Sequence, residues 1–135
     1  MWRCPDCDRI FGKAKQPHSC HKIPLEMHFK NKEKAKELFD FLIKTANEKI
    51  GKVRVISIPC CIHLFGKYDF LAILPKKDSL EIRFSLNRHL KNPRIIQSVP
   101  MSLKNIKNCL KISSASEIDK EFVDWLSESY HLKDG

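Results

Sequence analysis

The spacing of apolar residues separates helical from extended segments along this chain. Between residues 32 and 50, apolar side chains recur every three or four positions, which predicts an amphipathic helix. Asn31 is the expected N-cap of this helix, and Gly51 lies just beyond its expected end. The apolar positions are Ala35, Leu38, Phe39, Leu42, Ala46 and Ile50.

Between residues 79 and 86 the pattern changes to strict alternation, which is the period of a strand with one buried face. Residues 70–74 are apolar on both faces, so a central strand is expected over 68–74. Further strands are predicted at residues 53–58, 60–65, 95–99 and 106–112, the last two being weaker and separated by Pro100.

A second helix is predicted to close the chain. Ser116 with Asp119 three residues later has the spacing of a capping box. The apolar residues after it share one helical face: Ile118, Phe122, Trp125, Leu126 and Tyr130.

The order of these elements predicts the fold class. Most connections between strands are short, and short connections join antiparallel neighbours, because parallel strands need long crossovers. We therefore expect an α+β fold, with an antiparallel sheet of about five strands and two helices against one face. The expected domains are a small module at residues 1–24 and an α+β domain at residues 25–135.

The first twenty-one residues carry the sharpest chemical motif. Cys4 and Cys7 form a Cys-x-x-Cys knuckle, and His18, Cys20 and His21 offer three candidates for two further ligand positions. Four such ligands would close a tetrahedron around one structural zinc ion and leave no position open for water. A redox dithiol is disfavoured, because the knuckle lacks the βαβ context of thioredoxin-like motifs.

The same residues resemble a family catalogued as domain of unknown function 5655. The matching positions at the N-terminus are Met1–Cys7, Arg9, Phe11, Gln16 and His18–Cys20. Weaker matches extend through residues 28–29, 70–77, 80–86, 93–95 and 125–130. The resemblance implies a small α+β protein with no assigned activity and a zinc ligand set of Cys4, Cys7, His18 and Cys20. His21 departs from the family pattern, which has a small residue there, and is the substitute ligand.

Charge is unevenly distributed along the 135 residues, which carry a formal net charge of +9. Residues 76–111 hold nine lysines and arginines against two acids, whereas residues 112–135 are net acidic. A basic segment of this kind indicates contact with a polyanion such as nucleic acid, although a solvated lysine-rich surface explains it equally well. The candidate backbone-contacting residues are Arg83, Arg88, Lys91, Arg94, Lys107 and Lys111. The acidic closing helix could also pair with this strip and mask it.

Other candidate sites are weaker. Cys61 and His63 would share a strand face, but a buried, inert thiol pair at Cys60 and Cys61 is favoured over an activated nucleophile. The acids Asp119, Glu121, Asp124 and Glu128 fit a solvated helix face. The phosphate-binding motifs GxGxxG and GxxxxGK[ST] are absent.

The sequence therefore favours a non-enzymatic, zinc-containing module that binds DNA or RNA backbone without sequence preference. A protein-interaction or small-ligand module with purely structural zinc is the alternative. No apolar run reaches the length of a signal peptide or a membrane span, and we expect a cytoplasmic protein with no membrane partner.

Overall fold

The computed structural model describes residues 2–5, 10–11, 13–15, 22–66, 69–102 and 105–134. Two short strands, β1 (Trp2–Arg3) and β2 (Ile10–Phe11), pair antiparallel near the N-terminus. The helical elements are η1 (Leu25–Phe29), α1 (Glu33–Lys49), η2 (Ala115–Glu117) and α2 (Lys120–Asp134). The main strands are β3 (Arg54–Ile58), β4 (Cys61–Phe65), β5 (Asp69–Pro75), β6 (Leu80–Leu86), β7 (Ile95–Ser102) and β8 (Asn105–Ile112).

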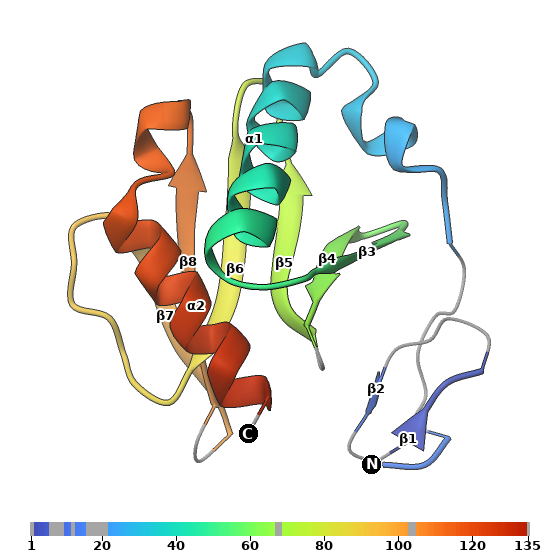
Figure 1. Ribbon diagram of the computed structural model, residues 1–135, viewed down its shortest axis with the longest axis vertical. Coiled ribbons are helices and arrows are strands. Elements are labelled where there is room, and N and C mark those ends of the chain that lie inside the picture. The colour runs from blue at the N-terminus through green and yellow to red at the C-terminus, as the bar shows by residue number, and fades with distance from the viewer. Residues whose placement is uncertain are drawn as a thin grey trace.

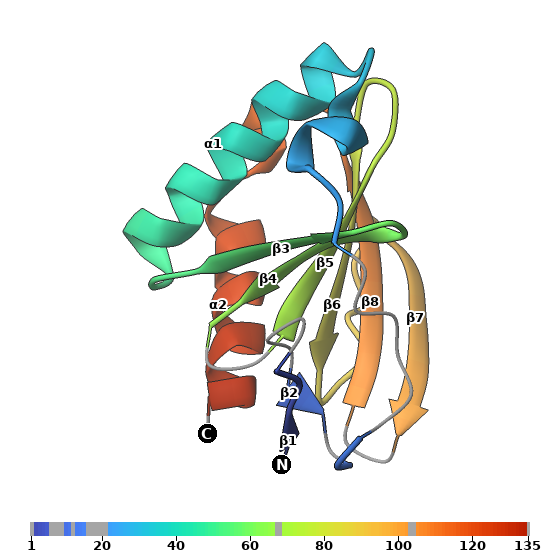
Figure 2. The same cartoon turned by 90° about the vertical axis from the view of Figure 1, so that its right-hand side faces the viewer.

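The α+β class is confirmed, and the main sheet is antiparallel with six strands rather than about five. Both α1 and α2 pack on the same side of this sheet, as Figures 1 and 2 show. The strict alternation predicted in β6 is present: Leu80, Ile82, Phe84 and Leu86 are buried in the main core. We call the opposite side of the sheet the helix-free face.

The strand order β3-β4-β5-β6-β8-β7 contains one departure from sequential pairing. β8 lies between β6 and β7 and is antiparallel to both, so β6 and β7 run parallel to each other. Short connections join neighbouring strands in the rest of the sheet, as expected, but residues 87–94 connect two strands that are not neighbours. This segment, which we call the crossing loop, must pass β8 to reach the far edge of the sheet.

The crossing loop is held by Asn108, a fully buried polar residue of β8. The Asn108 carbonyl oxygen accepts a hydrogen bond from the Leu90 backbone N–H at 3.1 Å, and its amide donates to the Arg88 carbonyl at 3.2 Å. Asn108 is directly opposite Phe84, whose side chain is in the helix-side core. The crossing loop therefore runs on the helix side of the sheet.

The helix ends differ in detail from their predicted caps. Lys32, not Asn31, is the N-cap of α1 and makes no side-chain cap hydrogen bond; Asn31 instead has a positive φ of 59°. Before the second helix, the capping box forms two residues earlier than predicted, between Ser114 and Glu117 at the start of η2. Asp119 accepts a hydrogen bond from the Phe122 backbone N–H at 3.0 Å and so caps α2.

The C-terminal half of α2 is fixed to the sheet by Ser129 and Tyr130. The buried Ser129 hydroxyl lies within hydrogen-bond distance of two strand carbonyls, Phe70 O at 3.0 Å and Ser85 O at 2.8 Å. The Tyr130 ring packs so close to Gly66 that a β-carbon there would lie 2.8 Å from Tyr130 Cδ2. Glycine at position 66 is therefore required by this contact.

The segment before α1 borders the edge strand β3. The Ile23 backbone N–H donates to the Ser57 carbonyl at 3.2 Å, and His28 Nε2 lies 2.9 Å from the Ile58 carbonyl. Burial lowers the pKa of His28 from its ordinary value. These contacts occupy part of an edge that would otherwise present unpaired backbone groups.

Candidate functional site: a cysteine-histidine cluster and a divided set of cations

A two-residue turn at the β3–β4 hairpin brings together the clearest cluster of ligand-type side chains. Ile58 pairs with Cys61, so Pro59 and Cys60 form the turn. Cys60 is exposed on this turn, whereas Cys61 is buried as the first residue of β4. His63 follows two residues later on the same face, because side chains alternate along a strand. Both Cys61 and His63 lie on the helix-free face, since the intervening Ile62 is in the helix-side core.

Cys60, Cys61 and His63, which we call the hairpin cluster, have their sulfur and ring nitrogen atoms close together. Cys60 Sγ is 2.6 Å from Cys61 Sγ, and Cys61 Sγ is 3.1 Å from His63 Nε2. One ligand atom from each of the three residues lies within 4.8 Å of the others, so the group could hold a metal ion.

Asp69 completes the surroundings of His63. Asp69 opens β5, and a register shift at Leu64 and Phe65 places it beside β4. Its Oδ2 lies 2.6 Å from His63 Nδ1. The two groups are in contact but poorly aligned, because the buried Nδ1 has no hydrogen-bond partner. The opposite ring nitrogen, Nε2, faces Cys61.

The protonation state of Cys61 argues against nucleophilic catalysis. Burial, followed by the contact with Cys60, raises the pKa of Cys61 to about 12. A catalytic cysteine needs a lowered pKa, because the thiolate is the nucleophile. Cys61 is therefore a buried thiol rather than an activated nucleophile, as the sequence predicted. For Cys60 the prediction of burial is wrong, because this residue occupies the exposed turn.

The predicted zinc ligands fall almost entirely in a part of the chain that the structure does not describe. Cys4 is buried, with 2% of its surface exposed. Cys7, His18, Cys20 and the substitute His21 lie outside the described residues. The ligand set of the N-terminal knuckle therefore stays a prediction.

The six basic residues predicted to contact a polyanion do not form one strip. Arg83, Lys107 and Lys111 lie on the helix-free face of β6 and β8, where Arg83 is opposite Cys109 and Lys111 is opposite Glu81. Arg83 also pairs with Glu81 on its own strand at 2.6 Å.

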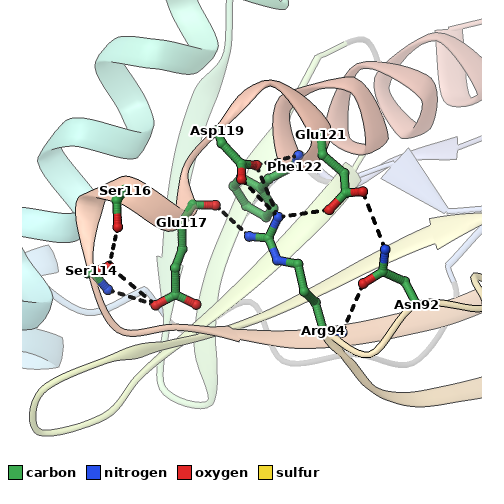
Figure 3. Close-up of polar contacts among 8 residues, drawn as sticks. All are labelled: Asn92, Arg94, Ser114, Ser116, Glu117, Asp119, Glu121 and Phe122. Carbon is green, nitrogen blue, oxygen red and sulfur yellow. Dashed lines mark hydrogen bonds and ion pairs between the residues drawn. The ribbon is translucent and has the colours of Figure 1, made fainter.

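The arginines of the crossing loop instead lie on the helix side and pair with the acids around α2. Arg88 binds both carboxylate oxygens of Glu128, at 3.1 and 2.8 Å. Arg94 reaches Asp119 at 3.0 Å and Glu121 at 3.2 Å (Figure 3). Lys91, between them, is exposed. The acidic closing helix thus masks two of the six predicted residues, because the loop that carries them crosses on its side of the sheet.

Comparison with known proteins identifies a family but no characterised relative. A family described as Domain of unknown function (DUF5655) matches residues 25–133. This range begins at η1 and ends within α2, so it includes the whole six-stranded sheet and the hairpin cluster. No curated protein and no solved structure matches the chain. No helix in the described parts of the chain is long and apolar enough to cross a membrane.

Proposed function

The chain belongs to the DUF5655 family, and from this premise we propose that it is a non-enzymatic, zinc-containing module that binds nucleic-acid backbone. The observation that carries the proposal is the group of cations on the helix-free face. Arg83 lies between Lys107 and Lys111 on the neighbouring strand, and neither lysine forms an ion pair with another described residue.

The arrangement suits phosphate contact rather than base recognition. Lys107 and Lys111 are four residues apart on one strand, a separation of about 13 Å at the usual rise. Lysine side chains carry a point charge on a flexible stem, which tolerates different phosphate positions. Phosphate contacts fix a protein on nucleic acid but carry no direct sequence information. We therefore expect binding with little sequence preference.

Zinc has a structural role in this proposal. Cys4, Cys7, His18 and Cys20 would hold one ion, and the burial of Cys4 fits a side chain that faces a packed metal site. A segment as short as residues 1–24 buries too little apolar surface to fold alone, so a metal ion would supply the missing stability.

The test is the salt dependence of binding to a fluorescently labelled duplex oligonucleotide, followed by anisotropy. Phosphate contacts by the two lysines without ion pairs give a slope near −1.8 in the logarithms of affinity and salt concentration, which is about a 12-fold loss between ~50 and ~200 mM salt. The double charge reversal Lys107→Glu with Lys111→Glu should lower both the affinity and this slope.

A matched control tests whether the position of the reversed lysines matters, or only the change in net charge. Lys34→Glu with Lys44→Glu changes the net charge equally, but both residues are exposed on α1, away from the helix-free face. Equal losses in the two double variants, or no binding by the unmodified protein at ~50 mM salt, would refute the proposal.

A groove between the two helices favours the alternative function. It has a volume of about 530 Å³ and is lined by residues that include Phe41, Thr45, Ile118 and Val123. Phe41 leaves 43% of its surface exposed. If the nucleic-acid test is negative, a protein-interaction or small-ligand module that uses this groove becomes the favoured function.

A further inference from the structure

We propose that the β3–β4 hairpin is a second metal site, in which Cys60, Cys61 and His63 hold one zinc ion. This site is separate from the N-terminal knuckle, and it does not depend on nucleic-acid binding. Its three residues come from one turn and one strand of the α+β domain.

The donor set determines the kind of metal. Two cysteine sulfurs and one imidazole nitrogen form a Cys₂His set, which is a common environment for zinc. Metal binding would release the thiol protons of Cys60 and Cys61 to solvent, because a bound metal ion strongly favours the thiolate. Thiolates are soft ligands that disfavour magnesium and calcium, whose sites are built from oxygen. Among the commonly available divalent ions, zinc is therefore the best match.

The geometry requires only a small rearrangement. With the usual zinc–ligand bonds, a tetrahedral site places two sulfurs about 3.8 Å apart, and sulfur and nitrogen about 3.5 Å apart. The corresponding distances here are 2.6 Å between the two sulfurs and 3.1 Å between Cys61 and His63. The sulfurs must therefore separate by about 1 Å. Cys60 can make this movement, because it lies on an exposed turn rather than within the core.

Asp69 provides an independent indication of a metal site. Histidines that bind metal usually direct their other ring nitrogen at a carboxylate, which fixes the ring and increases the basicity of the ligating nitrogen. The Asp69 carboxylate is 2.6 Å from His63 Nδ1, while Nε2 faces the sulfur of Cys61. Nδ1 is buried and otherwise unpartnered, so a purely structural histidine would be poorly satisfied here. A slight rotation of the ring on metal binding would align Nδ1–H with the carboxylate.

Three protein ligands leave one tetrahedral position for a water molecule or an external donor. The two thiolate ligands and the imidazole all approach from the hairpin, so the remaining position is opposite them. This distinguishes the hairpin from a four-ligand structural site, which has no open position.

The test measures zinc by mass spectrometry in the full-length protein after dialysis against zinc. Cys61→Ser and His63→Ala should each remove about one equivalent per chain. Cys109→Ser is the matched control, because Cys109 is also a buried cysteine on a strand but lies next to Gln97 rather than the cluster. Cys60→Ala provides a variant on the exposed turn, which removes a ligand without altering the core.

Two further measurements make the assignment specific. Cobalt substituted for zinc should show a sulfur-to-metal charge-transfer band, and this band should weaken in Cys60→Ala and Cys61→Ser but not in Cys109→Ser. Asp69→Asn should keep the stoichiometry while weakening zinc affinity about 10–100-fold, with the unfolding of the metal-free protein unchanged.

Unchanged zinc content and an unchanged cobalt spectrum in Cys60→Ala would overturn the proposal, because that variant preserves the buried residues. A Cys60–Cys61 disulfide in the purified protein, seen as a mass lower by two hydrogens, would overturn it as well. Neither result bears on the proposed nucleic-acid binding, because that proposal is tested separately by oligonucleotide anisotropy.

Discussion

Arg94 is expected to contribute to folding rather than to nucleic-acid binding, and its replacement by alanine tests this distinction. The guanidinium donates to Asp119 at 3.0 Å, to Glu121 at 3.2 Å and to the backbone carbonyl of Glu117 (Figure 3). It also lies 5.7 Å from the centre of the Trp125 ring. One side chain thus joins the end of the crossing loop to the start of α2.

The expected loss in the free energy of unfolding is about 2 kcal/mol. A hydrogen bond from a charged donor contributes about 1.5–3 kcal/mol, an exposed ion pair about 0.2–1, and an exposed cation–π contact about 0.5–1. The Arg94 side chain is only 22% exposed, but both acids are about half exposed, so their contributions lie near the lower end. The contacts share one guanidinium and are not additive, which places the expected total below their sum.

The loss of stability in Arg94→Ala should become smaller at low pH. The Phe122 backbone N–H, with a further contribution from Arg94, holds the pKa of Asp119 below its ordinary value of 3.8. The folded state therefore favours the Asp119 carboxylate. The contribution of this carboxylate to the free energy of unfolding is fully present above about pH 4, and it is lost as the pH falls through the lower folded pKa. Arginine stays charged throughout this range. The difference between Arg94→Ala and the unmodified protein should narrow below pH 4.

Urea unfolding followed by circular dichroism, at pH 7 and at pH 3, measures both effects. Lys120→Ala is the control, because Lys120 is 90% exposed and its pair with Asp124 should contribute less than about 0.5 kcal/mol. Equal stability losses in the two variants at pH 7 would refute the structural role of Arg94. A loss of oligonucleotide affinity in Arg94→Ala without any loss of stability would return Arg94 to the binding surface.

Two other predictions concern the N-terminal knuckle and the contact between Gly66 and Tyr130. Cys4→Ser should release one zinc equivalent from the N-terminal knuckle, and His18→Ala should weaken zinc binding more than His21→Ala; the reverse order would make His21 the ligand. Gly66→Ala should lower the free energy of unfolding by about 1–3 kcal/mol, because its β-carbon would overlap the Tyr130 ring. Part of this loss should disappear in a Tyr130→Ala background, and equal losses in both backgrounds would contradict the clash.

The elements of the fold were predictable because local patterns determine them. The alternation of β6 and the helical period of α1 are set by burial on one face, and both predictions hold to within a residue or two. The position of β7 was not predictable in the same way. Eight residues suffice either for a hairpin loop or for a passage across one strand, so length alone did not reveal the crossing loop. Asn108 was the available signal, because a polar residue on an apolar face must satisfy its hydrogen bonds.

The hairpin cluster was also predictable only in part, because some of its contacts are between residues on different strands. The period of a strand predicted that Cys61 and His63 share a face, but not that their side chains are in contact. Asp69 reaches His63 only through a register shift between β4 and β5, and its neighbouring sequence contains no sign of that shift. The carboxylate–histidine contact, which most strongly indicates a metal site, was therefore beyond the reach of sequence patterns.

The topology divides the basic segment, residues 76–111, into two groups of cationic side chains. The helix-free face carries Arg83 of β6 with Lys107 and Lys111 of β8. The crossing loop between β6 and β7 instead holds Arg88 and Arg94 on the helix side, next to α2. The arginines at the crossing meet carboxylates in fixed geometry, for which the planar guanidinium is well suited. Lys107 and Lys111 of β8 form no ion pair with a described acid, and flexible ammonium groups of this kind suit variable phosphate positions. Stability and polyanion affinity should therefore respond to different residues of the same basic segment.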